Sequence, residues 1–319
     1  MPPSRDPAVH RFAHEAMSTT FEVFIAGKGR TYAGQAARAA FDEIDRIELL
    51  FSRFDPSSEI SRIGRLGPGR SLRIGLETAE VLGLAAFVQR ETGGAFDIDH
   101  LGAARRAGGR ARRGPLPLAA LLRIDTDGRG FEVTRLRPKG RASAPALDLD
   151  LGAVGKGYAL DAALAVLRTW DVGNVLLHAG TSTALADGPG PASAGRGGGW
   201  PVGAGGAAGS ASGPGRVLLR RRSLSGSGTE VKGAHIVDPR SGRPAGGAVA
   251  AWASHPSAAV SDALSTAFMV MSPAEVAAFC RRHRAVWALV KTGPETCRIF
   301  NAGTMSEARP ARNSRRRSR

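Results

Sequence analysis

Three oxygen-bearing side chains recur at helical spacing in the segment DALST. Asp262, Ser265 and Thr266 stand at positions i, i+3 and i+4, so they share one face if the segment is helical. A carboxylate beside two hydroxyls is a hard-oxygen site of the kind that Mg²⁺ uses when substrate phosphates complete its shell. The alternative is a capping aspartate with hydroxyls that bond back to the helix, which is a common arrangement. The spacing alone leaves both interpretations open.

A single lysine stands in a glycine-rich bend, in the sequence LGAVGKGYALD. Lys156 follows an alternating acidic run and precedes a helical pattern, so free backbone N–H groups and the positive end of the helix favour an anion there. The next residue is Gly157 and not Ser or Thr, so the bend is neither a Walker loop nor the dinucleotide fingerprint. Lys156 is therefore either a phosphate-binding residue or a solvated lysine beside glycines that permit close packing.

A histidine precedes a turn in the sequence GAHIVDPRSGRP. His235 is followed by a short apolar step and by the turn residues Asp238, Pro239 and Gly242. An imidazole at that place could act as a general base near neutral pH. A lone histidine is more often structural, and this motif by itself does not decide between the two roles.

The elements that must position these residues follow from hydrophobic periodicity. Alternation predicts strands, and apolar residues three or four positions apart predict helices. The expected strands are 19–27, 146–151 and 174–180, and order is expected again over 216–228. The expected helices are 32–51, 76–94, a helix that begins after Gly157, and 262–283, with polar loops over 52–64 and 101–117. A strand, helix, strand unit would thus surround Lys156.

The chain divides into one large unit with two low-complexity segments. Residues 1–16 are an expected N-terminal extension, and residues 17–300 form the expected domain. Within it, residues 187–215 are so rich in Gly, Ala and Pro that they predict a flexible insertion, with a short strand near Trp200 to Val202. Residues 301–319 form a basic tail for which disorder is expected.

Composition limits the classes of function. The 319 residues carry a net charge of +16, but six arginines between Arg309 and Arg319 supply much of it, so nucleic acid is not the expected partner. Two cysteines, Cys280 and Cys297, indicate neither a disulfide framework nor a zinc fold. No apolar run has the length of a signal peptide or a membrane span, so a cytoplasmic location without a membrane span is expected.

Taken in order, the motifs resemble those of the ApbE-like FAD:protein FMN transferases. MSTTFEV resembles the opening strand of that family, FSRFDPSSEISRIG its Ser-Arg-Phe loop, and TGGAFDI its flavin segment. DLDLGAVGKGYALD is similar to the Gly-Ala-x-x-Lys-Gly-Tyr stretch of the family, and SLSGSG to its Thr-Ser-Gly turn. HIVDPRSGRP and SDALSTAFMVM are similar to its His-Ile-x-Asp-Pro motif and its metal helix. The resemblance implies an α+β fold, a single compact unit of two packed α/β halves with a cleft between them.

The resemblance also implies roles for individual residues. The residues implied to line the FAD pocket are Met17, Phe54, Ala95, Phe96, Asp97, Asp150, Lys156 and Val237. One or two Mg²⁺ ions would be held by the carbonyl of Ala153, by Asp262 and Thr266, and by Ser265. His235 would take the proton from the acceptor hydroxyl.

The implied activity is the transfer of FMN from FAD to a Ser or Thr hydroxyl of an acceptor flavoprotein, with release of AMP. The acceptor would carry a short motif that contains the Ser or Thr. Two alternatives stay open: a magnesium-dependent FAD pyrophosphatase that gives FMN and AMP, and a flavin-binding homologue that has lost turnover. Displacement at a pyrophosphate is mainly positioning and electrostatics, which suits a metal site with few protein ligands.

Overall fold

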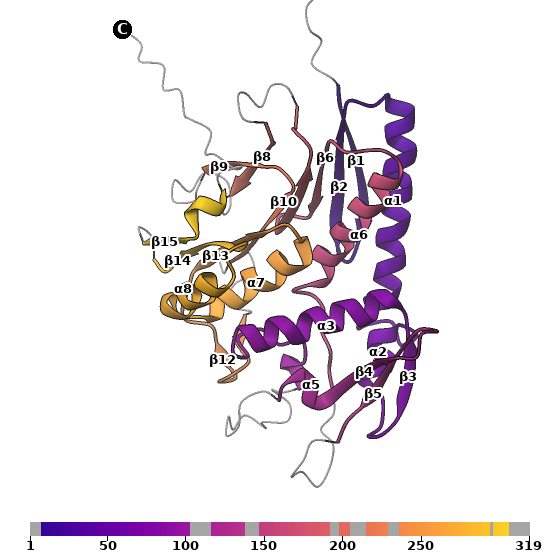
Figure 1. The fold of residues 1–319 in the computed structure, drawn as a ribbon, viewed down its shortest axis with the longest axis vertical. Coiled ribbons are helices and arrows are strands. Elements are labelled where there is room, and N and C mark those ends of the chain that lie inside the picture. Colours follow the sequence, from indigo (N-terminus) through magenta and orange to yellow (C-terminus); the bar gives the residue numbers. More distant parts are fainter. Residues whose placement is uncertain are drawn as a thin grey trace, which may run out of the picture.

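The computed structural model describes residues 8–102, 116–137, 147–191, 198–204, 215–228, 236–293 and 296–305. Figure 1 shows two packed parts, with a large sheet and its helices in the upper part and a small sheet with further helices in the lower part. None of the described helices is both long and apolar enough to cross a membrane.

An eight-stranded antiparallel sheet is the main element of the upper part. Its strand order is β1-β2-β6-β7-β10-β13-β14-β15, and every neighbouring pair runs antiparallel. This arrangement confirms the α+β expectation and excludes a doubly wound parallel sheet. The strands are β1 Val9–Ala16, β2 Thr19–Ala26, β6 Val175–Ala179, β7 Thr183–Asp187, β10 Arg222–Gly228, β13 Ala250–His255, β14 Trp287–Lys291 and β15 Cys297–Phe300.

Three helices cover one face of this sheet: α1 (Arg30–Phe51), α6 (Gly155–Thr169) and α7 (Ala258–Val270). In α1 the alternation of buried Ala40, Ile44 and Ile47 with exposed polar residues is the spacing that predicts an amphipathic helix. These side chains join residues of β2, β6 and the other two helices in the larger of two hydrophobic clusters.

The opposite face of the sheet is covered by a hairpin, β8 (Trp200–Ala204) and β9 (Gly215–Leu219). Trp200, Val202 and Leu219 of the hairpin are buried against Leu224 and Trp252 of the sheet in the second cluster. The hairpin corrects part of the expected flexible insertion 187–215, because apolar side chains at alternate positions give β8 a surface to bury. The strand expected near Trp200 is present, and the residues between β8 and β9 lie outside the described ranges.

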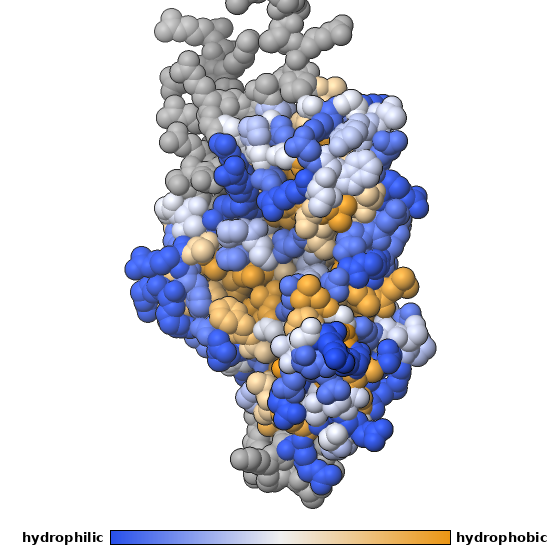
Figure 2. All heavy atoms as spheres, turned by 45° about the vertical axis from the view of Figure 1, so that its right-hand side comes forward, coloured by the Kyte–Doolittle hydropathy of each residue, from blue (hydrophilic) through white to orange (hydrophobic). Residues whose placement is uncertain are grey.

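The lower part consists of α2 (Glu59–Gly64), α3 (Leu76–Glu91), α5 (Leu118–Leu121) and a three-stranded sheet in the order β3-β5-β4. The strands are β3 Ser71–Ile74, β5 Phe131–Arg135 and β4 Leu122–Thr126. Helix α3 packs against α7 and so joins the two parts (Figure 1). Figure 2 shows a hollow lined by apolar side chains between the parts, where the cleft is expected.

The strand expected over 146–151 is wrong for the described residues 147–151, which have no regular structure. The alternation is real, since Leu147, Leu149 and Leu151 are buried. The intervening aspartates, however, bind side chains and not a neighbouring strand: Asp150 accepts a hydrogen bond from Arg53 (2.8 Å). The alternation of apolar and polar residues therefore indicates which side chains are buried, and it does not require a strand.

Two other boundaries differ from expectation. The expected loop 52–64 ends in helix α2, where the hydroxyl of the N-cap residue Ser58 accepts from the Ser61 amide. The helical stretch 262–283 is broken after Met271, and α8 (Pro273–Arg282) begins with a capping box made by Ser272 and Glu275. Both boundaries are set by short capping motifs, which hydrophobic periodicity does not detect.

The two ends of the chain also differ from the expected division into an N-terminal extension, one domain and a basic tail. Residues 9–16 of the expected N-terminal extension form the edge strand β1, which pairs with β2 along its whole length. Near the other end, a short 3₁₀ turn, Ala302–Met305, follows β15. Residues 306–319 of the expected tail and most of the expected loop 101–117 lie outside the described residues.

Two further short strands, β11 (Val237–Asp238) and β12 (Arg243–Pro244), pair with each other.

Candidate functional site

The candidate site is centred on a buried carboxylate in the second turn of α7. Asp262 is only 5% exposed. Its Oδ2 accepts a hydrogen bond from the Gly157 amide (3.1 Å) at the start of α6, and its Oδ1 accepts one from the Thr183 hydroxyl (3.2 Å) at the start of β7. Three elements far apart in the sequence thus meet at one side chain.

Asp262 does not cap its own helix. The N-cap of α7 is Ser257, whose hydroxyl accepts from the Val260 amide. Asp161 of α6 also serves this helix end, because its carboxylate accepts from the amides of Ala258 (2.8 Å) and Ala259 (3.0 Å). Burial raises the pKa of Asp161, although these hydrogen bonds favour its charged form. The capping interpretation of Asp262 is therefore wrong for α7.

Close packing explains the glycine after Lys156. A Cβ on Gly157 would lie 2.3 Å from the carbonyl oxygen of Ala258 and 2.8 Å from the Cα of Ala259. The start of α6 can touch the start of α7 only because this residue has no side chain. That contact in turn brings the Gly157 amide within reach of Asp262.

The two hydroxyls predicted beside Asp262 meet a serine of β10. The Ser227 hydroxyl lies 2.9 Å from that of Ser265 and 3.4 Å from that of Thr266. Ser265 is fully buried and also donates to the carbonyl of Asp262 (2.9 Å), which is the back-bonding that the structural alternative expects. The three side chains DALST supplies are thus gathered on one side of α7.

A ladder of buried serines holds α7 on the sheet. Ser223 and Ser225 of β10 lie 2.6 and 3.0 Å from the hydroxyl of Ser261, one turn before Ser265. Together with Ser227 they occupy alternate positions of one strand, so all three point toward the helix. The ladder fixes the position of Asp262 along the sheet.

The oxygen donors fit a hard divalent cation. Asp262 supplies a carboxylate, Thr266 and Ser265 supply hydroxyls, and Ala153 lies one turn before Gly157, so its carbonyl is at the end of α6 that meets Asp262. All are oxygens, as Mg²⁺ prefers. Within the described ranges no group of three or more His, Cys, Asp and Glu side chains could hold a metal. Asp262 is thus the one carboxylate in this set of oxygens.

Lys156 lies in the first turn of α6, and its Nζ donates to the carbonyl of Gly152. The Gly152 amide in turn donates to Asp150 (2.8 Å). The bend is therefore tied down by its own polar groups, and the ammonium group stays near the helix start. This placement agrees with an anion-binding bend but does not by itself select it over a solvated lysine.

Several residues of the implied flavin pocket are brought together. The Asp150 amide donates to the carbonyl of Ile98 (2.7 Å), which places it beside the segment Ala95–Asp97. Ala95, Phe96 and Asp97 are buried, and the Asp97 carboxylate accepts from the Asp99 amide. Arg53, which donates to Asp150, also lies over the ring of Phe54, with its Cζ 5.3 Å from the ring centroid.

Phe54 itself is 84% exposed, which is unusual for so large an apolar side chain. A ligand or a partner that packs against this ring would remove its apolar surface from water. Met17 occupies the tight turn between β1 and β2, where it and Ser18 both have positive φ (49° and 58°). Non-glycine residues pay about 1 kcal/mol or more for that conformation, so the turn presents Met17 at some energetic cost.

Two predicted residues remain, Val237 and His235. Val237 lies in the two-residue strand β11, where it pairs with Pro244 of β12. His235 lies outside the described residues, so its predicted role as a base is untested by the geometry. Sequence reasoning missed Thr183, Ser227 and Arg53. The alternating serines of SLSGSG were the signal for Ser227; no local pattern marks Thr183.

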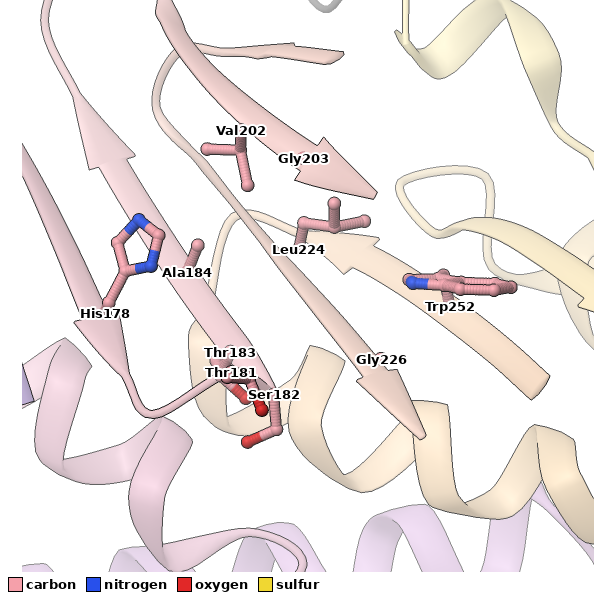
Figure 3. A pocket seen from close by; sticks show the side chains of 10 residues that line it. All are labelled: His178, Thr181, Ser182, Thr183, Ala184, Val202, Gly203, Leu224, Gly226 and Trp252. Atoms are coloured by element: carbon pink, nitrogen blue, oxygen red, sulfur yellow. The ribbon is translucent and has the colours of Figure 1, made fainter. Parts of the chain in front are cut away.

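A separate small pocket of about 70 Å³ lies on the other face of the sheet (Figure 3). His178, Val202, Leu224 and Trp252 line it, together with the turn residues that lead into β7. Burial lowers the pKa of His178, because the charged imidazolium is disfavoured away from water. Thr183 also lines the pocket, and its hydroxyl bonds Asp262, so the pocket adjoins the polar cluster on α7 although Asp262 itself does not line it.

Comparisons with known proteins agree on one family. The model of the ApbE family matches residues 17–290. A protein of Rhodobacter capsulatus named FAD:protein FMN transferase is 33% identical over 134 residues, which are 41% of this chain and 25% of that protein. The aligned region thus spans about a quarter of the length of that relative.

Solved structures show the same fold. The apo form of the flavinyl transferase ApbE of Pseudomonas stutzeri superposes with a TM-score of 0.69 and 21% identity, covering 94% of this chain and 97% of its own. The ApbE protein of Thermotoga maritima gives 0.74 and 21%, covering 94% and 99%. The flavin transferase ApbE of Vibrio cholerae gives 0.70 and 18%, covering 93% and 99%.

Proposed function

Since this chain belongs to the ApbE family, we propose that it transfers FMN from FAD to a Ser or Thr hydroxyl of an acceptor protein in a magnesium-dependent reaction. The observation that carries the proposal is the buried carboxylate of Asp262, which accepts from the start of α6 and shares one side of α7 with the hydroxyls of Ser265 and Thr266. The relative from Rhodobacter capsulatus named for this activity supports it.

The proposed reaction is a displacement at phosphorus. The acceptor hydroxyl oxygen forms a bond to the phosphorus of the FMN moiety, and the bond from that phosphorus to the AMP oxygen breaks. AMP leaves with the electron pair, and the hydroxyl proton passes to a base. His235 is our proposed base, and a positioned base of this kind contributes roughly 10²- to 10⁴-fold.

In this proposal Asp262, Thr266, Ser265 and the carbonyl of Ala153 hold Mg²⁺. The ion supplies charge stabilisation to the pyrophosphate oxygens when it is bound. The chain itself positions these ligands through α6 and α7, which the Gly157 contact locks together. Lys156 and the first amides of α6 offer positive charge to the FAD phosphates from the same end of the helix.

The flavin part of FAD has a proposed place in the hollow between the two parts of the molecule (Figure 2). Phe54, the segment Ala95–Asp97 and Asp150 are gathered by Arg53 and by the backbone of Ile98, and Met17 and Val237 complete the proposed set. A flat aromatic ring system suits an exposed phenylalanine, because stacking covers the ring without requiring a specific polar partner.

The test is to incubate the purified protein with FAD, with and without Mg²⁺, and to measure AMP. A candidate acceptor is added in a parallel reaction and analysed by mass spectrometry for a covalently attached FMN. We expect AMP release only with Mg²⁺ and a mass increase on the acceptor.

Each outcome has a distinct meaning. AMP release with free FMN and no modified acceptor indicates the pyrophosphatase alternative. FAD binding with no AMP under any condition indicates the homologue without turnover, and it contradicts the proposal.

A further inference from the structure

The two oxygens of the Asp262 carboxylate are each held by a donor from a different element. Oδ2 takes the Gly157 amide of α6, and Oδ1 takes the Thr183 hydroxyl of β7. Asp262 itself belongs to α7, so three different elements meet at its carboxylate. The orientation of the carboxylate therefore depends on two groups that are not themselves in the predicted metal site.

Thr183 is well placed to fix that orientation. It is the first residue of β7, pairs with Ala179 on one side and Ser225 on the other, and is only 3% exposed. A β-branched side chain in a central strand has few accessible rotamers, so its hydroxyl has little freedom to move. The Thr183 hydroxyl is the donor in this pair.

We propose that Thr183 is a positioning residue for the metal ligand Asp262, and that its hydroxyl sets the affinity of the site for a divalent cation. The inference rests on the proposed function and extends it to a residue outside the predicted ligand set. Groups that hydrogen-bond to a metal ligand orient it, and their loss typically weakens metal binding by about 10- to 100-fold.

The alternative to a positioning role is a purely structural one, in which the Thr183 hydroxyl bonds Asp262 without affecting metal binding. Thr183→Val separates the two, because valine keeps the shape and the strand preference but removes the donor. Thr183→Ser is the matched rescue variant, because it keeps the hydroxyl and loses only a methyl group. A structural role predicts a change in melting temperature for Thr183→Val with no change in metal affinity.

A second buried threonine provides the control. Thr78 of α3 is fully buried, and its hydroxyl has no hydrogen-bond partner in the described structure. Thr78→Val makes the same chemical change away from the metal site. It is expected to leave metal affinity as in the wild type.

The experiment is a titration of each protein with Mn²⁺, a spectroscopic substitute for Mg²⁺, followed by electron paramagnetic resonance of the free ion. It is done without FAD and with FAD, and melting temperatures are recorded beside it. We expect Thr183→Val to weaken Mn²⁺ binding by about 10- to 100-fold, and Thr183→Ser and Thr78→Val to stay within about threefold of the wild type.

Folded Thr183→Val that binds Mn²⁺ as tightly as the wild type overturns the inference. If Thr183→Val does not fold, Thr183→Ala is the second hydroxyl-free variant, and the same comparison with Thr183→Ser decides. A wild type that binds no Mn²⁺ in either condition overturns it as well. Failure of the proposed function is distinguishable: the wild type then binds Mn²⁺ but releases no AMP from FAD.

Discussion

The amide of Gly157 donates to the carboxylate of Asp262 across 3.1 Å, although the two residues lie 105 positions apart in the chain. The contact exists because the starts of α6 and α7 touch at a residue without a side chain. The motif that carries the lysine and the motif that carries the carboxylate are therefore two halves of one site, and changes at either half are expected to affect the other.

Gly157→Ala is expected to destabilise the protein and to abolish AMP release. The added Cβ would lie 2.3 Å from the Ala258 oxygen, which is backbone and cannot move aside cheaply. We expect a loss of about 1–3 kcal/mol or more in the free energy of unfolding, measured by urea titration. Gly83→Ala in α3 is the control, because nothing lies within 4 Å of that Cβ, and alanine in a helix should stabilise by about 0.5–1 kcal/mol. Equal effects at both glycines would contradict the packing argument.

Asp262→Asn is expected to lower the rate of AMP release by more than about 100-fold at saturating FAD and Mg²⁺. Asparagine removes the negative charge from the proposed metal site. Its amide oxygen can accept from the Gly157 amide, and its amino group can donate to the Thr183 hydroxyl, which then acts as an acceptor, so a stability change below about 1 kcal/mol is expected. Turnover equal to the wild type at saturating Mg²⁺ would refute the metal-site assignment.

Phe54→Ala is expected to raise the KM for FAD by about tenfold while the melting temperature stays unchanged. Stacking of an aromatic ring on a flat heterocycle contributes about 1–3 kcal/mol, and the ring of Phe54 is 84% exposed, so the fold does not need it. Steady-state kinetics and a thermal melt measure the two quantities. The matched control is Ile299→Ala on the edge strand β15, where an apolar side chain is 54% exposed. A KM for FAD that is the same in both variants would remove Phe54 from the pocket.

Acidification is expected to destabilise the protein between about pH 6.5 and pH 4 through a buried histidine. Burial, with the charge of Arg222, lowers the pKa of His255 from 6.5 to about 4. In this range the unfolded chain binds a proton that the folded chain does not, so stability falls as pH falls, by up to roughly 3 kcal/mol. Burial of His178 acts in the same direction.

His255→Asn tests this assignment, because an amide oxygen can accept the Ser257 amide that now donates to Nδ1 of His255. The difference in unfolding free energy between pH 7 and pH 4.5 should be smaller in the variant than in the wild type. An identical pH dependence in the two proteins would assign the acid sensitivity to other groups.

The long amphipathic elements could be predicted from the sequence, because their burial follows a single period. Helix α1 and strands β2 and β6 lie where periodicity placed them. The run at 147–151 failed for a physical reason: its leucines are buried one by one, while Asp150 binds the side chain of Arg53. Alternation reports which residues face the core, and only backbone pairing makes a strand.

The sequence could predict the oxygen-bearing side chains that α7 brings to the candidate site, but not the residues that hold them in place. Asp262, Ser265 and Thr266 share a helix face, which spacing alone reveals. Thr183 reaches Asp262 from a strand 79 positions earlier, and no local pattern encodes that distance. The same limit applies to Arg53, which joins Phe54 to Asp150 across 97 positions.

The order of strands in the large sheet has a consequence for how the chain reaches its native state. From β6 onward, the connections between neighbours in the sheet are shorter, and the longest of them, from Asp187 of β7 to Arg222 of β10, has 34 residues. The pairing of β2 with β6 is different, because Ile25 and Val175 meet only after 149 intervening residues have been looped out. Closing so long a loop is entropically slow. Docking of the β1–β2 hairpin is therefore expected to be the late, rate-limiting event of folding, with α1 attached to the hairpin that arrives last.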